Sequence, residues 1–200
     1  MRSLAVLVAI NVVLTSAGCV DESVPSVAGP SRAGSNGSTS GGAPRVKLEA
    51  AVSGRTGTCP AIRFTLGGIS VETTASTQFE LACDRVVDGA AVEVDAPRMT
   101  GGVLAAREVD FGDDALRSPD FEAEGPIEAI TQAEDCSSVA GRSVTVLGLQ
   151  FTVGSFTEVR DIANGCSGLT AASRVRARGR LTNPPAAPVF PLRATRIEPR

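Results

Sequence analysis

Two stretches of sequence decide the fold: FTLGGISV at residues 64–71 and VTVLGLQF at residues 144–151. Each alternates apolar and polar residues on both sides of a central pair, Gly67-Gly68 in the first and Leu147-Gly148 in the second. Alternation with a period of two is typical of half-buried strands, and glycine in the central pair favours a tight turn. The sequence therefore predicts a β-hairpin at each place.

The similarity between the two stretches extends over most of the chain. Ala91–Asp95 matches Arg174–Arg178, Leu104–Val109 matches Leu192–Ile197, and Val46 with Leu48 matches Phe121 with Ala123. The first repeat is expected at 46–112, the linker at 113–119 and the second repeat at 120–200. Strands are predicted near 46–53, 61–66, 69–74, 77–81, 90–96 and 103–111, with counterparts in the second repeat. Short turns or helices are predicted near Val86 and Leu169.

Six short strands per repeat favour closure into a small barrel, because closure removes exposed sheet edges. The expected fold class is all-β: two tandem small antiparallel β-barrels, OB-like, behind a signal segment and a disordered linker.

The N-terminus has the features of an export signal. Arg2 precedes an apolar run from Leu4 to Leu14, which is shorter than the roughly 20 residues that a bilayer-spanning helix needs. Residues 1–18 are thus predicted to be a signal peptide. The sequence TSAGC at residues 15–19 resembles a bacterial lipobox, which implies lipidation of Cys19; the alternative is ordinary cleavage after Ala17.

The expected location is the outer membrane or cell surface, facing the periplasm or the exterior, with the membrane as a partner through the N-terminal lipid. Val20 follows Cys19 in place of the Asp that retains lipoproteins at the inner membrane. Residues 19–45, rich in Gly, Ser and Pro, are expected to be a disordered tether because they lack apolar periodicity.

Turn and strand positions of both repeats resemble the pattern of a bacterial family catalogued as domain of unknown function 5666. The positions that carry the resemblance are Gly68, Thr77, Gly89 to Val94 and Ala106 to Val109 in the first repeat, and Gly125 to Ile127, Gly148, Thr157, Val175 and Ala194 to Ile197 in the second. Ala50 stands where the opening Gly of the family pattern is usual. The resemblance implies an exported chain with tandem compact barrels similar to the OB class. It implies no activity.

Five cysteines leave an even set once Cys19 is assigned to the lipid. The repeat favours one pairing within each copy, Cys59–Cys83 and Cys136–Cys166. Loops of this size stabilise a fold by about 3 kcal/mol. The alternative, a structural zinc site, is disfavoured because the chain has no Cys-x-x-Cys pair and no His.

Several chemistries are disfavoured by what the sequence lacks. With no His, the chain has neither the commonest general base nor the commonest transition-metal ligand. It has no Gly-x-Ser-x-Gly elbow and no phosphate-binding loop. A net charge of −3 and the absence of Trp and Tyr argue against nucleic acid. No catalytic residue, cofactor or metal site is expected.

Two charged segments are candidate sites. Four arginines alternate along one predicted strand and so share a face: Arg174, Arg176, Arg178 and Arg180. Glu93 and Asp95 are the first-repeat equivalents of Arg176 and Arg178. The face is a candidate contact for the other repeat, for a second molecule, for an envelope protein, or for an anionic glycan or lipid head group. The alternative is a solvated face that prevents aggregation.

The second segment joins the repeats and is acidic, with Asp110, Asp113, Asp114, Asp120, Glu122 and Glu124. It is either a solvated linker or a weak Ca²⁺ site. The expected function is a non-enzymatic binding or interaction module of the cell envelope. The alternatives are a carboxylate- or Ca²⁺-dependent polysaccharide hydrolase and a purely structural envelope spacer.

Overall fold

The computed structural model describes residues 43–112, 119–131, 137–138, 141–181 and 192–200. The predicted signal peptide, Cys19, Cys136, most of the predicted tether and most of the linker lie outside these residues. The described chain is all-β, with two short 3-10 turns, which confirms the expected fold class at this level.

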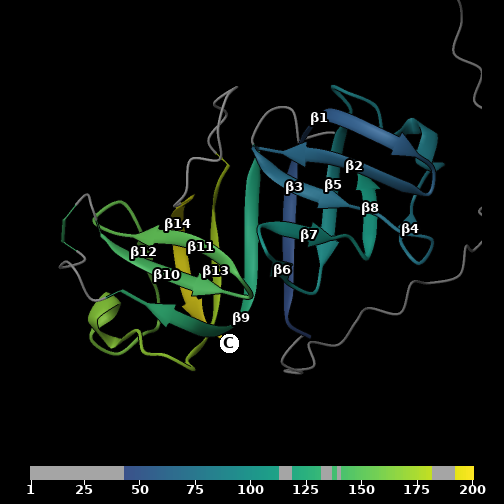
Figure 1. The fold of residues 1–200 in the computed structure, drawn as a ribbon. Helices are drawn as coiled ribbons and strands as arrows, with labels where there is room; N and C mark the ends of the chain where they lie inside the picture. The colour runs from purple at the N-terminus through teal and green to yellow at the C-terminus, as the bar shows by residue number, and fades with distance from the viewer. Residues whose placement is uncertain (1–42, 113–118, 132–136, 139–140, 182–191) are drawn as a thin grey trace, which may run out of the picture. The chain divides into compact units, whose positions relative to one another are not determined.

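The strands of the first repeat follow the predicted order (Figure 1). They are β1 Arg45–Thr58, β2 Ala61–Leu66, β3 Ile69–Glu72, β4 Gln78–Phe79, β5 Ala91–Ala96, β6 Met99–Thr100, β7 Val103–Ala105 and β8 Glu108–Phe111, with the turn η1 Cys83–Arg85. Those of the second repeat are β9 Asp120–Ile130, β10 Arg142–Val146, β11 Leu149–Val153, β12 Glu158–Val159, β13 Arg174–Arg180 and β14 Leu192–Pro199, with η2 Gly165–Gly168.

Both predicted hairpins are present, β2–β3 and β10–β11. Their turn residues have left-handed φ angles, 53° and 85° at Gly67 and Gly68, and 51° and 77° at Leu147 and Gly148. Positive φ at both central residues is the turn geometry whose twist matches that of the flanking strands.

The second repeat closes into a five-stranded barrel. Its pairings run β9–β10–β11–β14–β13 and return to β9. The expectation of a wholly antiparallel barrel is wrong, because β11 pairs with β14 in parallel. A parallel pair needs a long crossover, and the chain between these strands passes through β12, η2 and β13 before it returns.

The first repeat has the same strand order with one interruption. Its pairings run β1–β2–β3–β7 on one side and β1–β5–β8 on the other. Ala106 and Arg107 separate β7 from β8, so the last strand of the repeat is split in two.

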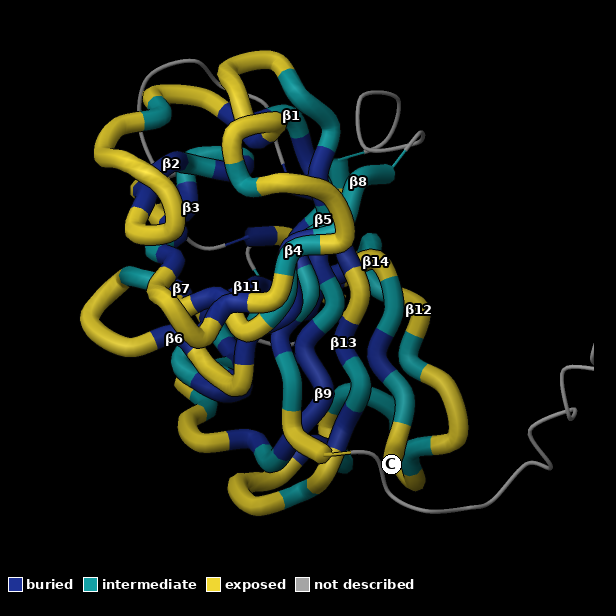
Figure 2. The backbone as a smooth tube through the Cα atoms, turned by 90° about the vertical axis from the view of Figure 1, so that its right-hand side faces the viewer, coloured by how far each residue is buried: buried dark blue, intermediate teal, exposed yellow. Residues whose placement is uncertain are grey.

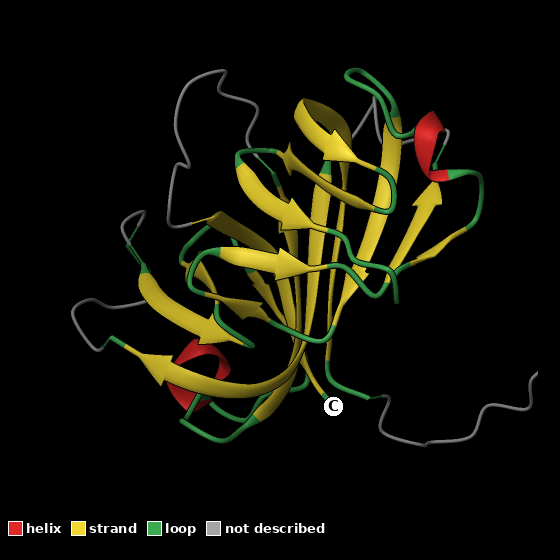
Figure 3. Cartoon of the chain, turned by 45° about the vertical axis from the view of Figure 1, so that its right-hand side comes forward, coloured by secondary structure: helices red, strands yellow, loops and turns green. Residues whose placement is uncertain are grey.

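The two repeats share one continuous sheet through β1 and β9, which lie side by side and antiparallel (Figure 1). Figure 3 shows the strands of the described chain in yellow and the two short helical turns in red. Lys47 lies directly opposite Glu122, and these two residues occupy equivalent positions in the two repeats. A strand that pairs with its own equivalent in this way places a local pseudo-twofold axis between Lys47 and Glu122.

The hairpins reinforce this junction reciprocally. The first-repeat hairpin turn lies against Leu181, since a Cβ on Gly67 would be 2.8 Å from the Leu181 Cβ. In the second-repeat hairpin, the Leu147 carbonyl accepts a 2.8 Å hydrogen bond from the Met99 N–H. Leu181 lies directly after β13, and Met99 lies shortly after the equivalent strand β5. Each hairpin therefore contacts the segment that follows this strand in the other repeat.

The core is aliphatic, as the scarcity of aromatics predicts. Alternate residues of β1 are buried from Val46 to Val52, and β9 shows the same alternation except at Ala123 to Gly125, which are all buried (Figure 2). Phe121 and Phe151 pack at 5.8 Å between ring centroids. Burial of one side of each strand leaves the other side free to carry charge.

The first predicted disulfide, Cys59–Cys83, is confirmed, with a Cα–Cα distance of 5.9 Å. It ties the β1–β2 turn to η1. Cys166 is also disulfide-bonded. Its predicted partner, Cys136, lies outside the described residues.

Candidate functional site: a charged face across the repeat junction

The outward-facing side chains of six neighbouring strands form one surface, which we call the charged face. The strands lie in the order β14, β13, β9, β1, β5 and β8. Because alternate residues point to opposite sides of a sheet, Leu48 and Phe121 point into the core while Lys47 and Glu122 point outward.

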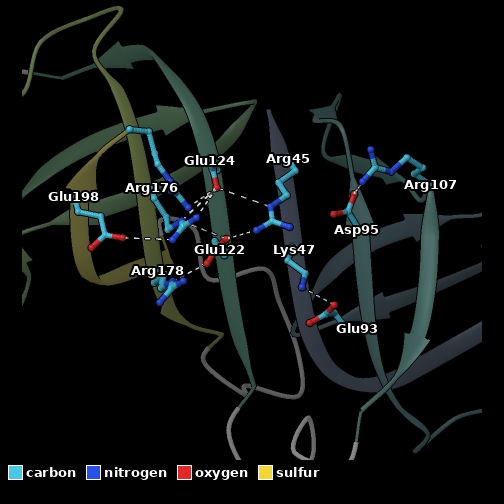
Figure 4. Close-up of polar contacts among 11 residues, drawn as sticks. Arg45, Lys47, Glu93, Asp95, Arg107, Glu122, Glu124, Arg176, Arg178 and Glu198 are labelled. Carbon is cyan, nitrogen blue, oxygen red and sulfur yellow. Dashed lines mark hydrogen bonds and ion pairs between the residues drawn. The ribbon is translucent and has the colours of Figure 1, made fainter. Parts of the chain in front are cut away.

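One line of cross-strand neighbours on this face is an alternating set of charges, the ion-paired row. It consists of Glu198, Arg176, Glu124 and Arg45. Glu124 is only 2% exposed. Its Oε2 accepts hydrogen bonds from Arg176 Nη2 at 3.0 Å and from Arg200 Nη2 at 3.2 Å (Figure 4). Arg45 Nε lies 3.9 Å from the same oxygen. Several guanidinium groups thus compensate one buried carboxylate.

The next line, which includes the pseudo-twofold pair, is also mixed in sign. Arg178 Nε donates to Glu122 Oε2 at 2.6 Å, and Arg45 Nη2 donates to Glu122 Oε1 at 3.2 Å. On the first-repeat side, Arg107 Nη2 lies 2.7 Å from Asp95 Oδ1. This contact is an ion pair without hydrogen-bond geometry, since the same oxygen has no hydrogen-bond partner within the described residues.

The third line differs, because its cross-strand neighbours on β9, β1, β5 and β8 are all acidic, while Arg180 of β13 lies opposite Asp120 at its other end. This carboxylate row consists of Asp120, Glu49, Glu93 and Asp110. Lys47 Nζ lies 2.7 Å from Glu93 Oε1. Directly opposite like charges destabilise a sheet.

Two members of the carboxylate row have raised pKa values. Partial burial raises the pKa of Asp120 above its ordinary value, and the negative charges of Glu93 and Glu122 raise it further. Burial, followed by the charges of Glu108 and Glu93, does the same to the pKa of Asp110. Both shifts result first from partial burial of the carboxylate and then from the negative charges beside it.

A shallow hollow of about 210 Å³ opens over the β1–β9 junction. We call it the junction hollow; its lining residues are Lys47, Glu49, Glu93, Asp120, Phe121, Glu122 and Arg178. Three members of the carboxylate row therefore face one space, together with two cations. Such a space has the charge to hold a polar or ionic group and the size of a side chain rather than of a drug-sized ligand.

The four arginines predicted as a face all lie on β13, but they differ in their surroundings. Arg176 and Arg178 are paired with Glu124 and Glu122 of the same repeat. Arg174 and Arg180 are exposed and form no ion pair within the described part of the chain. The structure does not bring Arg176 and Arg178 to their first-repeat equivalents, Glu93 and Asp95, which pair with Lys47 and Arg107 instead.

The predicted acidic segment is divided in the structure. Asp120, Glu122 and Glu124 lie on β9 and Asp110 lies on β8, whereas Asp113 and Asp114 are outside the described residues. Among the described residues, no three His, Cys, Asp or Glu side chains are arranged to hold a metal ion. The described part of the chain also contains no helix long and apolar enough to span a membrane.

Sequence reasoning missed the carboxylate row and the junction hollow. The residues of the row come from four strands, and only the register between β1 and β9 places Asp120 opposite Glu49. A comparison of equivalent positions could have shown one signal: acidic residues stand at Asp120 and Glu93 where the other repeat has Arg45 and Arg176.

These features define an all-β protein of two repeats with a common strand order, joined by one sheet that carries a charged face. A family model described as "Domain of unknown function (DUF5666)" matches residues 57–110 and 124–198. The chain belongs to this family, and the two matched segments are consistent with tandem copies. No curated protein and no solved structure matches the chain significantly.

Proposed function

We propose that this chain is an exported, lipid-anchored binding module of the cell envelope, without enzymatic activity, that uses its charged face to contact an anionic partner. The apolar run from Leu4 to Leu14 and the lipobox-like sequence before Cys19 support export and anchoring. The Cys59–Cys83 disulfide agrees with an oxidising compartment.

The proposal includes two OB-like barrels in tandem. The closed second repeat and the same strand order in the interrupted first repeat support this part. Small barrels of this kind use their outer strands as binding surfaces for extended ligands.

The observation that carries the binding role is the exposure of Arg174 and Arg180 on β13, within a face that runs across both repeats. Exposed guanidinium groups can form bidentate contacts with carboxylates, sulfates or phosphates. Arg176 and Arg178, by contrast, are already engaged by carboxylates.

Binding is favoured over polysaccharide hydrolysis by the dimensions of the junction hollow. Acid–base hydrolysis needs two carboxylates on opposite sides of a bound glycosidic bond. The hollow measures about 210 Å³, and its carboxylates Asp120, Glu49 and Glu93 lie on adjacent strands of a single surface.

Two measurements test the proposal. In a bacterial host with lipoprotein processing, the wild-type chain should incorporate labelled palmitate and fractionate with membranes, and Cys19→Ala should do neither. Wild-type protein that remains soluble in the cytoplasm would contradict the anchoring.

Binding to an anionic partner is tested with immobilised dextran sulfate as the probe. Arg174→Gln with Arg180→Gln should elute at clearly lower salt than the wild type. The matched control is Arg63→Gln with Arg85→Gln, which also removes two positive charges, from exposed side chains on β2 and η1 of the first repeat. Equal elution of all three proteins would contradict a role for Arg174 and Arg180.

A further inference from the structure

One line of the charged face reverses its charges across the pseudo-twofold axis at Lys47 and Glu122. The axis relates β14 to β8, β13 to β5 and β9 to β1, and we call the line of cross-strand neighbours through this pair the middle row (Figure 4). From β14 to β8, the middle row consists of Arg196, Arg178, Glu122, Lys47, Asp95 and Glu108. The axis exchanges the first member with the sixth, the second with the fifth and the third with the fourth. Each charge of this row therefore changes places with a charge of opposite sign.

The carboxylate row has the same polarity once its neighbours on β13 and β14 are included. Arg180 lies opposite Asp120, and Arg193 lies opposite Arg180. Both arginines are exposed, and neither forms an ion pair within the described part of the chain, although the Arg193 guanidinium lies over the Phe156 ring. At the other end of the row, Asp110 lies opposite another carboxylate and has no ion pair among the described residues. Like charges are therefore neighbours at both ends, which destabilises a sheet.

We propose that two copies of the chain form a dimer by packing their charged faces together, about a twofold axis that runs parallel to the strands along the β1–β9 junction. This rotation places β14 of one copy on β8 of the other, β13 on β5, and β9 on β1. Two sheets that pack face to face keep their strands within about 30° of each other, so the rows of the two copies stay roughly aligned. The inference rests on the binding role proposed for the charged face and names a second copy as the anionic partner; it does not depend on export.

In this arrangement, each member of the middle row faces its equivalent of opposite charge in the other copy. Three kinds of contact result, and each occurs twice: Lys47 with Glu122, Arg178 with Asp95, and Arg196 with Glu108. Complementary charge of this kind steers association and fixes the register of the two partners.

The carboxylate row and its two arginines contribute further contacts. Arg180 faces Glu93 of the other copy, and Arg193 faces Asp110. These contacts supply opposite charges to Arg180, Arg193 and Asp110, which have no ion pair within the described residues of one copy. One unfavourable contact remains, where the two acidic residues nearest the axis face each other.

A second copy accounts for both ends of the face, whereas an unrelated anionic polymer would engage only the basic end. The alternative twofold axis, across the strands, would place basic end on basic end, and facing like charges disfavour that pairing. Partly exposed charges are screened by salt, so the dimer should dissociate as the ionic strength rises. Association through apolar segments would not weaken in this way.

Sedimentation velocity measures the association directly. The purified full chain at low ionic strength should show a monomer–dimer equilibrium that shifts to monomer as sodium chloride is added. A chain that is monomeric at every concentration measured, or a dimer that is insensitive to salt, would overturn the inference.

Charge exchange between the two ends tests the arrangement. Arg180→Glu with Arg193→Glu should weaken dimerisation by at least about tenfold, because carboxylates would face carboxylates. Glu93→Arg with Asp110→Arg should weaken it in the same way, because guanidinium groups would face each other. An equimolar mixture of the two variants should form a heterodimer, since each substituted end then faces an end of opposite charge. The absence of a heterodimer would overturn the arrangement.

The matched control is Arg63→Glu with Arg85→Glu, which reverses two exposed charges outside the charged face. It should dimerise as the wild type does, and equal weakening in this control would overturn the assignment of the interface. Thermal unfolding followed by circular dichroism checks that each variant folds. Where a charge reversal does not fold, Arg180→Gln with Arg193→Gln should still weaken dimerisation.

Dextran sulfate separates this inference from the proposed function. Glu93→Arg with Asp110→Arg should lose the dimer and keep its binding to dextran sulfate, because the arginines of β13 are unchanged. A wild-type chain that binds dextran sulfate but stays monomeric would overturn the dimer and leave the proposed function standing.

Discussion

Neutralising two carboxylates of the same strand should change stability in opposite directions. Glu124→Gln removes the charge that compensates Arg176 at 3.0 Å and Arg200 at 3.2 Å, at a side chain that is 3% exposed. Loss of a buried ion-pair partner costs 3–5 kcal/mol, and these arginines keep some exposure, so we expect a loss of about 2 kcal/mol. Asp120→Asn removes like-charge repulsion on the carboxylate row and should add about 0.5 kcal/mol.

The assay is urea unfolding of the full chain, followed by far-ultraviolet circular dichroism between pH 4 and pH 8. The raised pKa of Asp120 means that the folded state favours the protonated form. The stability that this protonation contributes is fully present below the ordinary value of 3.8 and is lost as the pH rises through the folded-state pKa. Asp120→Asn should therefore gain most at neutral pH and little near pH 4. Destabilisation by both substitutions at pH 7 would refute the distinction between the two rows.

Three further predictions concern the framework. Replacing Cys59 and Cys83 by Ala should lower the free energy of unfolding, measured in urea, by about 3.5 kcal/mol. This value follows from the loop-entropy relation for a sequence separation of 24. A loss under about 1 kcal/mol would contradict the prediction. Gly148→Ala would place a Cβ against the Met99 carbonyl, so it should lower the melting temperature. The control is Gly102→Ala, because Gly102 has a similar φ, 82°, but open space around it, and its effect should be clearly smaller. Equal shifts would mean that the junction contact is unimportant. Arg107→Ala leaves Asp95, which is 7% exposed, without its ion pair, so we expect a loss of about 2 kcal/mol at pH 7. Burial raises the pKa of Asp95, so the loss should shrink as the pH is lowered and this carboxylate becomes protonated; a pH-independent loss would exclude this cause.

Local features of the fold were predictable because they depend on neighbours in sequence. Alternation at 64–71 and 144–151 predicted the two hairpins, and Gly68 and Gly148 predicted turns that need positive φ. The equivalent places of the cysteines in the two repeats predicted Cys59–Cys83. The parallel pairing of β11 with β14 was not predictable in the same way, because strand direction across a long crossover is set by which strands finally lie side by side.

The candidate site was predictable only in part. The shared face of Arg174 and Arg180 follows from the period of a strand, but the pairing of Arg176 with Glu124 depends on the register between β13 and β9. The acidic residues around Asp120 were visible as a composition bias, whereas their meeting with Glu49 and Glu93 required the β1–β9 junction.

The sequence by itself determined the repeat, the strand periodicity and the residues able to carry charge on the outer side of each strand. Only the tertiary structure decided which of these charges are neighbours. It did so by pairing β1 with its own equivalent, β9, and so placing a pseudo-twofold axis at Lys47 and Glu122. The physical reason is that alternation along a strand depends only on neighbours in sequence. The energy between two charges depends on their distance in space, and this distance is set by which strands pair and in which register.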